Sequence, residues 1–361
     1  MDTMNALITD GSGSASVQRV PRPKPGPGEL LIKIHYAAQN PTDWKAIRGA
    51  TAAMPPAGRI VGCDFAGTVE DTGTSALGFR PGQRVAGFVQ GSSVNGTEAN
   101  PIRGAFADYI PVEETLVYTV PGNISLEDAA AIPLVFATAV QALYQRLTLP
   151  EPENASVDPL PFLVYGGATG VGKQAIQLAK LSGCYVIATA SVKNHDHLKE
   201  LGADEVVDYH DHDWPQKVYQ MTNGQLRHAL DCVGGKGTAA GVAEALSRDG
   251  GDICSIIPLS EAVKGEIAAA NHKARAQSTI AYTVFGRPLK YGAFDNCGGE
   301  TPLDKAMWEK YLRLLPGLLS QGRVKPGRVK NMGTLHDILD GLRLSQQGSV
   351  AAEKLVYKVV E

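Results

Sequence analysis

A glycine-rich turn between an apolar strand and a helix constrains the fold of this chain more than any other feature. Residues 164–173 read VYGGATGVGK, after an apolar run at 162–165 and before a helix predicted over 171–181. Glycines let a backbone approach a phosphate closely, and a helix N-terminus attracts anions. Thr169 stands where a G-x-G-x-x-G motif ending at Gly172 requires glycine. The turn is therefore either a dinucleotide-binding loop or a purely structural turn, and its strand–loop–helix setting favours the first.

Strands and helices alternate beyond this turn. The pattern predicts strands at the apolar runs and helices between them, with strands over residues 185–190, 205–208, 228–231 and 252–257 and helices over 196–201 and 237–246. Such alternation is typical of a doubly wound parallel sheet.

The first 120 or so residues have a different character, with short strand candidates separated by many of the 40 glycines and 22 prolines. These candidates lie at residues 30–37, within 59–69, at 81–88 and at 104–110. Ser125 is a candidate N-cap for an alanine-rich helix that runs towards Leu147, and the C-terminal part adds helices over 307–319 and 334–344 and a strand over 354–360. We expect an α/β domain at 136–285, inserted into a β-rich domain formed by 1–135 and 286–361.

Composition excludes several classes of function. The formal net charge of -3 gives no sign of the excess positive charge that nucleic-acid binding requires. The longest uncharged run, residues 129–145, contains a proline and polar side chains, and no signal peptide is visible at the N-terminus, so we expect a cytoplasmic protein without a membrane span. The five cysteines are scattered, with no CxxC and no close Cys/His pair, which predicts neither disulfides nor a metal cluster.

The end of the strand at 185–190 bears on the choice of cofactor. NAD sites usually place an acid about 20 residues beyond the glycine loop, on the ribose hydroxyls. Here the chain continues with Ser191 and Lys193 and no acid, a hydroxyl and a cation suited to a 2'-phosphate. This pattern favours NADPH. In the alternative interpretation, Ser191 caps the next helix and Lys193 is solvated.

Three segments carry a resemblance to a known family. Residues 40–43 read NPTD, 62–69 read GCDFAGTV and 81–85 read PGQRV. Together they resemble the medium-chain dehydrogenase/reductase superfamily, in particular its zinc-free, quinone oxidoreductase-like branch. Cys63 and Asp64 stand at the positions of the His and Glu in the G-H-E block of zinc-dependent members, so the resemblance implies no zinc. It implies a GroES-like catalytic domain and a Rossmann domain.

A narrower resemblance is to fungal trans-acting enoyl reductases of polyketide biosynthesis, a secondary metabolite pathway. It rests on residues 40–49, 104–109, 230–232, 285–292 and 353–357. The resemblance implies an oxidoreductase that moves hydride from NADPH to the β-carbon of an α,β-unsaturated thioester held on a synthase carrier domain. A general NADPH quinone or alkenal reductase, and a non-catalytic NADPH-binding partner of a synthase, are the alternatives.

The resemblance also implies individual site residues. Lys45 is the candidate donor of a hydrogen bond to the thioester oxygen or of the proton itself, and Thr138 is the candidate contact to substrate or nicotinamide. Their alternatives are a surface lysine and a hydroxyl bonded within its own helix. The implied NADPH contacts are Thr42, Gly167, Ala168, Thr169, Gly170, Val171, Gly172, Ser191, Val192, Lys193, Asn194, Tyr209, Ile256, Ile257, Val350 and Ala351.

Two expectations concern partners. The densest basic stretch is a candidate docking rim for an acidic carrier domain, or a solvated turn; it comprises Arg323, Lys325, Arg328 and Lys330. The glycine- and proline-containing segment after Val284 could block pairing through the last strand of the cofactor domain, so we expect a monomer.

Overall fold

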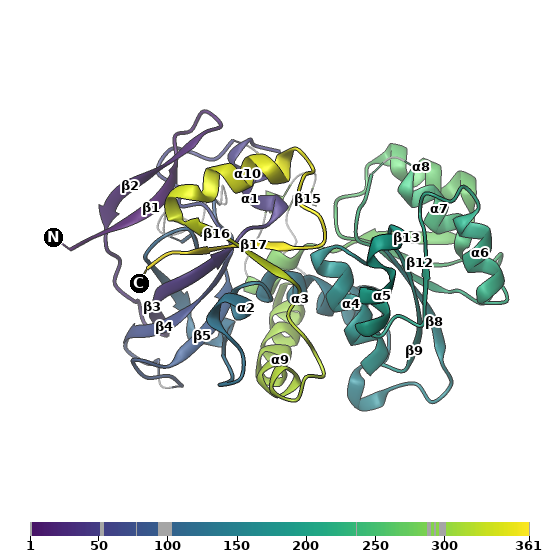
Figure 1. Cartoon of the computed structure of the whole chain (residues 1–361), viewed down its shortest axis with the longest axis horizontal. Coiled ribbons are helices and arrows are strands. Elements are labelled where there is room, and N and C mark those ends of the chain that lie inside the picture. Colours follow the sequence, from purple (N-terminus) through teal and green to yellow (C-terminus); the bar gives the residue numbers. More distant parts are fainter. Residues whose placement is uncertain are drawn as a thin grey trace. The chain divides into compact units, whose positions relative to one another are not determined.

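A computed structural model describes residues 2–50, 54–76, 78–92, 103–235, 237–286, 290–291, 294–295 and 301–360. The chain divides into two compact units, one of residues 1–134 with 282–361 and the other of residues 135–281 (Figure 1). The second unit is inserted into the first. We call them unit 1 and unit 2.

Unit 2 contains a six-stranded sheet in the order β10-β9-β8-β11-β12-β13, with every pairing parallel. Its strands are β8 (Leu160–Tyr165), β9 (Cys184–Thr189), β10 (Glu205–Val207), β11 (His228–Asp231), β12 (Gly251–Ser255) and β13 (Ala274–Ser278). The order reverses between β8 and β11, and ligands of open α/β sheets bind outside the carboxyl ends of the strands at such a point.

Helices cover both faces of this sheet, as Figure 1 shows. On one face lie α4 (Gly170–Leu181) and α5 (His195–Glu200); on the other lie α6 (Trp214–Met221), α7 (Thr238–Ala245) and α8 (Glu261–Ala270). Short 3₁₀ turns lie at η3 (Pro152–Asn154) and η4 (Val192–Asn194). The parallel sheet buried between helices confirms the predicted doubly wound class.

Unit 1 is built on a sheet in the order β16-β17-β3-β4-β5-β7, with β6 also paired to β3. The strands are β3 (Glu29–Ala38), β4 (Asp64–Thr72), β5 (Arg84–Phe88), β6 (Tyr109–Glu113), β7 (Val117–Thr119), β16 (Val329–Thr334) and β17 (Lys354–Lys358). A hairpin of β1 (Thr3–Thr9) and β2 (Ala15–Pro21) joins through bridges at Ala6–Ala107 and Ile8–Ile60, and β14 (Lys290–Tyr291) pairs with β15 (Phe294–Asp295).

The helices of unit 1 are α1 (Pro41–Ile47), α2 (Leu126–Ala130), α9 (Thr301–Ser320) and α10 (Ile338–Gln346), with 3₁₀ turns η1 (Glu114–Leu116), η5 (Ala281–Phe285) and η6 (Leu335–Asp337) at its edges. Helix α3 (Pro133–Val140), continued by the π-helical turn η2 (Gln141–Arg146), runs from one unit into the other. Buried aromatic rings of Phe88, Phe285 and Trp308 pack together in unit 1, with ring centroids 5.2 Å and 5.7 Å from Phe88.

Some predicted elements are wrong in extent. The predicted helix from Ser125 towards Leu147 is three successive helical segments, and the predicted strand at 104–110 is found at Tyr109–Glu113. The predicted helix at 334–344 begins at Ile338, because Asp337 accepts the Thr334 backbone N–H and closes a 3₁₀ turn first. Ile256 and Ile257 follow the strand that they were expected to end, since β12 stops at Ser255. Residues 287–289 and 292 of the segment at 285–292 lie outside the described residues.

Candidate active site

The glycine turn of unit 2 is held by its neighbour strand. Gly166 has a φ of +80°, a left-handed conformation that favours glycine. Its N–H donates to the Thr189 hydroxyl at 3.0 Å, and the next N–H, of Gly167, donates to the Thr189 carbonyl at 2.9 Å. A Cβ on Gly172 would lie 2.4 Å from the Gly166 carbonyl oxygen. The first turn of α4 therefore sits directly against the loop, as a phosphate cradle requires.

Thr169, the residue that interrupts the glycine motif, caps α4. Its hydroxyl accepts the Gly172 N–H at 3.0 Å. Ala168, Thr169 and Gly170 are partly exposed, whereas Gly167, Val171 and Gly172 are buried. The threonine satisfies one of the free donors of the helix N-terminus and leaves the exposed part of the loop open.

Asp231, at the end of β11, organises the neighbouring loop, and sequence reasoning missed this role. Its Oδ1 accepts the N–H groups of Val233 and Gly234, both at 2.9 Å, and its Oδ2 accepts the Thr238 hydroxyl at 3.2 Å. Burial raises the pKa of Asp231, and these hydrogen bonds oppose the rise. The signal was an acid at the carboxyl end of a buried strand, followed by two glycines.

Exposed apolar side chains follow three strands of the sheet at their carboxyl ends. Val192 after β9 is 66% exposed, Tyr209 after β10 is 43% exposed and Val233 after β11 is 46% exposed. The Tyr209 ring lies against His210, with centroids 4.2 Å apart. Large apolar groups left in water at one sheet edge are typical of a ligand site.

The segment that follows β9 has no carboxylate between residues 190 and 194. It forms the 3₁₀ turn η4, in which Asn194 donates to the Ser191 hydroxyl at 3.1 Å, and Ser191 makes no side-chain cap. Lys193 is exposed. Three features fit a dinucleotide: a backbone cradle with no room for a Cβ, exposed apolar side chains beside it, and the exposed Lys193 after the second strand, β9.

The remaining predicted residues of unit 2 and of the C-terminal segment differ in exposure. Ile256 and Ile257 are half-buried beyond β12, and Thr138 is buried in α3 at 8% exposure. Val350 is half-buried and Ala351 is exposed, before β17 in unit 1.

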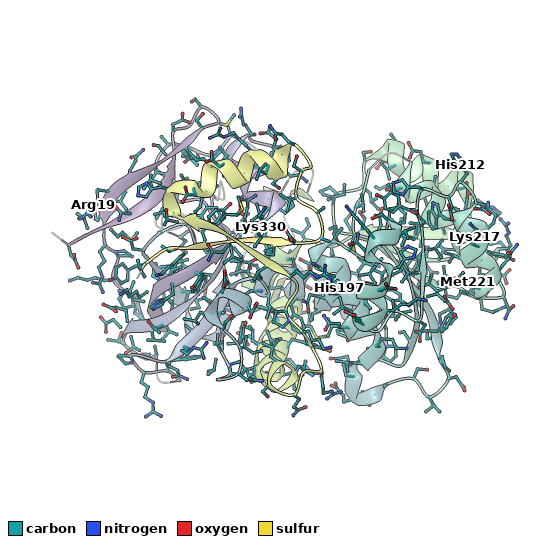
Figure 2. All side chains as sticks on the ribbon, in the orientation of Figure 1. Arg19, His197, His212, Lys217, Met221 and Lys330 are labelled. Carbon is teal, nitrogen blue, oxygen red and sulfur yellow. The ribbon has the colours of Figure 1, made fainter. Side chains whose placement is uncertain are left out.

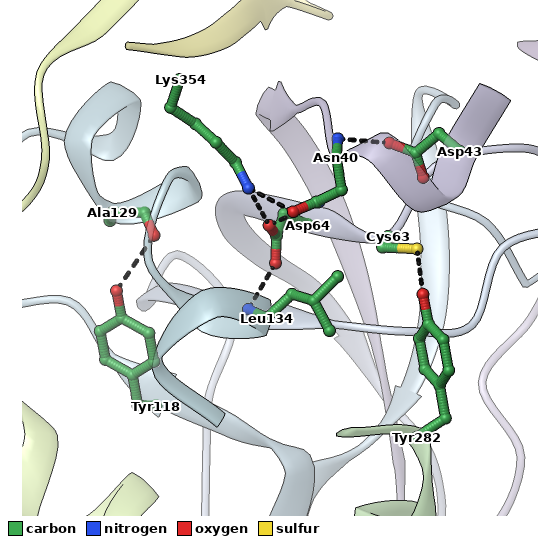
Figure 3. A network of polar contacts seen from close by, with 9 residues as sticks. All are labelled: Asn40, Asp43, Cys63, Asp64, Tyr118, Ala129, Leu134, Tyr282 and Lys354. Atoms are coloured by element: carbon green, nitrogen blue, oxygen red, sulfur yellow. Dashed lines mark hydrogen bonds and ion pairs between the residues drawn. The ribbon is translucent and has the colours of Figure 1, made fainter. Parts of the chain in front are cut away.

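A buried polar network joins distant parts of unit 1 (Figure 3). The Asp64 carboxylate, at the start of β4, accepts the side-chain amide of Asn40 at 2.8 Å, the backbone N–H of Leu134 at 2.8 Å and the ammonium of Lys354 at 3.1 Å. Lys354 also donates to the Asn40 side-chain oxygen. The Asp64 side chain is fully buried and that of Lys354 is 12% exposed. This network fixes the residue that precedes α1.

Helix α1 carries Thr42 and Lys45. Thr42 is half-buried, and its hydroxyl accepts from the Tyr282 hydroxyl at 3.1 Å. Lys45 is half-buried and forms no ion pair within the described residues, and burial alone lowers the pKa of its ammonium. A partly buried lysine without a counter-ion is costly, and groups of this kind concentrate at functional sites.

Asp43 lies between these two residues in sequence and points into the protein. Its Oδ2 accepts the Asn40 N–H at 2.7 Å, while its Oδ1 is buried without an N–H or O–H donor in the described part of the chain. Burial raises the pKa of Asp43 to about 7, opposed by the Asn40 N–H, the Cys63 thiol and the charge of Lys354. Burial also raises the pKa of Cys63. Figure 3 shows the Cys63 sulfur between the Asp43 carboxyl group and the Tyr282 hydroxyl.

Other polar clusters offer little for catalysis. Within the described residues, no group of three His, Cys, Asp or Glu side chains is arranged to hold a metal ion. His212 and Lys217 lie on the surface of unit 2 (Figure 2), and His210 is exposed and paired with Asp208 at 2.6 Å. The four cations of the basic stretch at 323–330 are all exposed, including Lys330 in Figure 2. No helix in the described ranges is long and apolar enough to cross a membrane.

Comparisons with known proteins place the chain in a family. Residues 26–122 match the alcohol dehydrogenase GroES-like domain, and residues 170–280 match the zinc-binding dehydrogenase domain. The trans-enoyl reductase ACTTS2 of Alternaria alternata is 33% identical over 364 residues, which cover 99% of this chain and 100% of that protein. This chain belongs to the trans-enoyl reductase family. It is accordingly a member of the medium-chain dehydrogenase/reductase superfamily and an oxidoreductase, and the family implies a nicotinamide cofactor.

Two further similarities concern the family and the fold, respectively. The trans-enoyl reductase resD of Aspergillus sclerotiorum is 34% identical over 376 residues, covering 99% of this chain and 100% of that one. The crystal structure of an alcohol dehydrogenase superfamily protein from Novosphingobium aromaticivorans has the same fold, with a TM-score of 0.81 over 100% of both chains at 23% identity. The predicted GroES-like and Rossmann fold class is confirmed.

Proposed function

We propose that this member of the trans-enoyl reductase family uses NADPH to reduce an α,β-unsaturated thioester held on the carrier domain of a polyketide synthase. In this proposal unit 1 is the substrate domain and unit 2 is the cofactor domain. Bound NADPH would supply the hydride that adds to the substrate β-carbon. The observation that carries the proposal is Lys45, a half-buried ammonium that forms no ion pair within the described residues, on the helix that begins in the NPTD segment.

In this proposal NADPH binds at the carboxyl edge of the unit 2 sheet. The loop at 167–172 would hold the pyrophosphate on backbone N–H groups. Ser191 and Lys193 would contact the 2'-phosphate, with Val192, Asn194 and Tyr209 beside the adenosine. Ile256 and Ile257 would contact the nicotinamide half of NADPH. Thr42, Val350 and Ala351 are the proposed cofactor contacts from unit 1.

Lys45 acts on the charge that develops during the reaction. Addition at the β-carbon leaves negative charge on the thioester oxygen, and a donor fixed at that oxygen stabilises the transition state. A lysine that is already desolvated loses little hydration when it makes this contact, and its lowered pKa makes its proton a stronger hydrogen-bond donor. Thr138, buried in α3, is the proposed second contact to substrate or nicotinamide.

The first experiment measures NADPH oxidation with enoyl thioesters of increasing chain length, on pantetheine and on the carrier domain. We expect turnover that is faster with carrier-bound thioesters. Lys45→Ala should lower kcat by about 10²–10³-fold and leave NADPH affinity unchanged, whereas the exposed Lys24→Ala changes neither. Faster turnover of free quinones than of thioesters indicates a general quinone or alkenal reductase. NADPH binding without turnover of either indicates a non-catalytic partner.

Two proposals concern association. The exposed stretch of Arg323, Lys325, Arg328 and Lys330 is the proposed docking rim for an acidic carrier domain, and its fourfold replacement should raise KM for carrier-bound substrate only. The edge strand β13 presents Arg275 and Gln277 to solvent, and charged or polar side chains on an edge disfavour pairing with another chain. We therefore propose a monomer, which sedimentation tests.

A further inference from the structure

A chain of four proton-bearing side chains runs through unit 1 and ends on helix α1. It comprises Asp43, Cys63, Tyr282 and Thr42. The Tyr282 hydroxyl donates to the Thr42 hydroxyl at 3.1 Å, and the Cys63 sulfur lies 3.4 Å from the Tyr282 oxygen. Figure 3 shows the Cys63 sulfur beside the Asp43 carboxyl group, which stands next to Thr42 in sequence but is turned into the interior.

The hydrogens of this chain can be ordered from the contacts. Tyr282 has one hydroxyl hydrogen, and Thr42 accepts it, so the hydrogen between Cys63 and Tyr282 belongs to the thiol. The Cys63 sulfur is then left as an acceptor toward Asp43. A protonated carboxyl group provides the matching O–H donor, and this donor also satisfies Oδ1, which otherwise has no N–H or O–H partner in the described residues. Every link then points from Asp43 to Thr42.

We propose that this chain is a proton relay, which delivers the proton of Asp43 through Cys63 and Tyr282 to Thr42 and from there to the substrate. The inference rests on the proposed reduction, because it supplies the proton that the α-carbon needs after hydride addition. Asp43, Cys63 and Tyr282 act through Thr42, as positioning and relaying residues.

The proton steps balance. The Thr42 O–H bond breaks as a C–H bond forms at the α-carbon of the thioester enolate, whose electron pair makes the new bond. The Tyr282 proton moves to the Thr42 oxygen, and the thiol proton of Cys63 moves to the Tyr282 oxygen. The Asp43 proton moves to the Cys63 sulfur, so the only net change is a carboxylate at Asp43. Water returns a proton through the half-buried Thr42 along the same chain after product leaves.

Charged and titratable groups act on Asp43 from two neighbouring strands. Cys63 and Asp64 come from the β4 side, and Lys354 and Tyr357 come from β17. Asp64 favours the protonated form of Asp43, and Lys354 opposes it, but Lys354 is already bound to Asp64. Desolvation is the largest influence and raises the pKa of Asp43 to about 7, so the group can gain and release a proton near neutral pH.

The decisive experiment compares Tyr282→Phe with Tyr118→Phe. Both tyrosines are buried in unit 1, and Tyr118 donates to the Ala129 carbonyl, outside the chain of four. Tyr282→Phe should lower kcat for thioester reduction about tenfold and abolish the fall of kcat as pH rises through about 7. Tyr118→Phe should leave the rate and the pH profile unchanged.

Variants at Cys63 separate the relay from packing. Cys63→Ser keeps a group that can accept and donate a proton, and should retain the pH-dependent limb; Cys63→Ala should lose it. Tyr282→Phe with the wild-type rate and pH profile overturns the relay, and so does a Cys63→Ala enzyme that keeps the limb.

An infrared measurement keeps the relay distinct from the proposed reaction. The C=O band of a protonated carboxyl group should be present below pH 7, absent in Asp43→Asn, and shifted in Cys63→Ala but not in Tyr118→Phe. Absence of this band in wild type overturns the relay whatever the activity. If the band behaves as expected but no thioester is reduced, the proposed reaction fails, and the proposed delivery to an enolate fails with it.

Discussion

The two units build their candidate sites from different materials. In unit 2 the glycine turn presents backbone N–H groups, which are directed by the Thr189 hydroxyl and carbonyl of the adjoining strand and by the Thr169 hydroxyl at the start of α4. In unit 1 the site is formed by side chains that come from distant parts of the chain, with Asp64 as the shared acceptor for Asn40, Leu134 and Lys354. A backbone site tolerates changes of side chain but not of shape, whereas a buried side-chain site fails when one charge loses its partner.

The largest effect should come from breaking the charged centre of unit 1. Lys354→Met leaves the fully buried Asp64 carboxylate without its cation, which should lower the free energy of unfolding by about 3–5 kcal/mol. Urea denaturation measures the loss. Adding Asp64→Asn to Lys354→Met removes the unpaired carboxylate and should restore part of the lost stability. Arg275→Met, which breaks an exposed pair with Asp252, should have no measurable effect. Equal losses in Lys354→Met and Arg275→Met would contradict the distinction.

The next prediction tests whether Asp43 of unit 1 is protonated, and therefore uncharged, in the folded protein. The pKa of Asp43 is about 7 in the folded protein, compared with the ordinary aspartate value of 3.8 that applies to the unfolded chain. The folded state therefore binds the proton more tightly, so the stability from this group is complete below 3.8 and is lost as pH rises through about 7.

Asp43→Asn should remove this dependence. The free energy of unfolding of wild type should fall relative to the variant by about 4 kcal/mol across that pH range. Denaturation of both proteins at a series of pH values measures the difference. Parallel curves for the two proteins would show that Asp43 is ionised throughout.

The same contrast explains what sequence reasoning could predict. The glycine loop was found because its signal is local: a strand, a turn and a helix follow one another within residues 162–181. Thr169 interrupts the motif, and only the structure reveals that its hydroxyl caps α4. The fold class followed for the same reason, from alternating periodicity in unit 2 and from the segments that resemble the family.

The network of unit 1 has no local signal. Asn40 and Lys354 are separated by 314 residues, and no spacing rule connects them. Cys63 was recognised only as standing at the position of a missing zinc ligand, and its contact with Tyr282 depends on a segment 219 residues away. The hairpin of β1 and β2, and helix α1, were not predicted either, because short elements are stabilised by tertiary contacts more than by their own periodicity.

A shape change in the backbone site of unit 2 should have an intermediate effect. Gly172→Ala places a methyl group 2.4 Å from the Gly166 carbonyl and 2.8 Å from the Gly167 Cα, so the loop must shift. We expect a loss of about 1–3 kcal/mol in stability and at least a tenfold weaker binding of NADPH.

The matched control is Gly265→Ala in α8. Gly265 is exposed, and nothing lies within 4 Å of the added methyl group. This variant should be unchanged or more stable by about 0.5–1 kcal/mol, because alanine favours the helix. Calorimetric titration with NADPH and thermal unfolding measure both properties. Normal NADPH binding by Gly172→Ala would show that the cofactor does not bind at this loop.

The smallest effect concerns a side chain at the edge of the backbone site. Lys193 is exposed and lies in a turn without acidic residues. Lys193→Ala should weaken NADPH binding about tenfold, roughly 1.4 kcal/mol, because the contact with the 2'-phosphate is solvent-exposed. NADH binding should be unchanged, since NADH has no phosphate there. Lys199→Ala, an exposed lysine of α5, is the control for general charge. If Lys193→Ala lowers the affinities for NADPH and NADH equally, the lysine supports the loop and does not select the cofactor. If Lys193→Ala keeps the full preference for NADPH over NADH, Ser191 and the backbone of η4 alone provide that preference. The cofactor site of unit 2 then depends on its side chains even less than the contrast between the units implies.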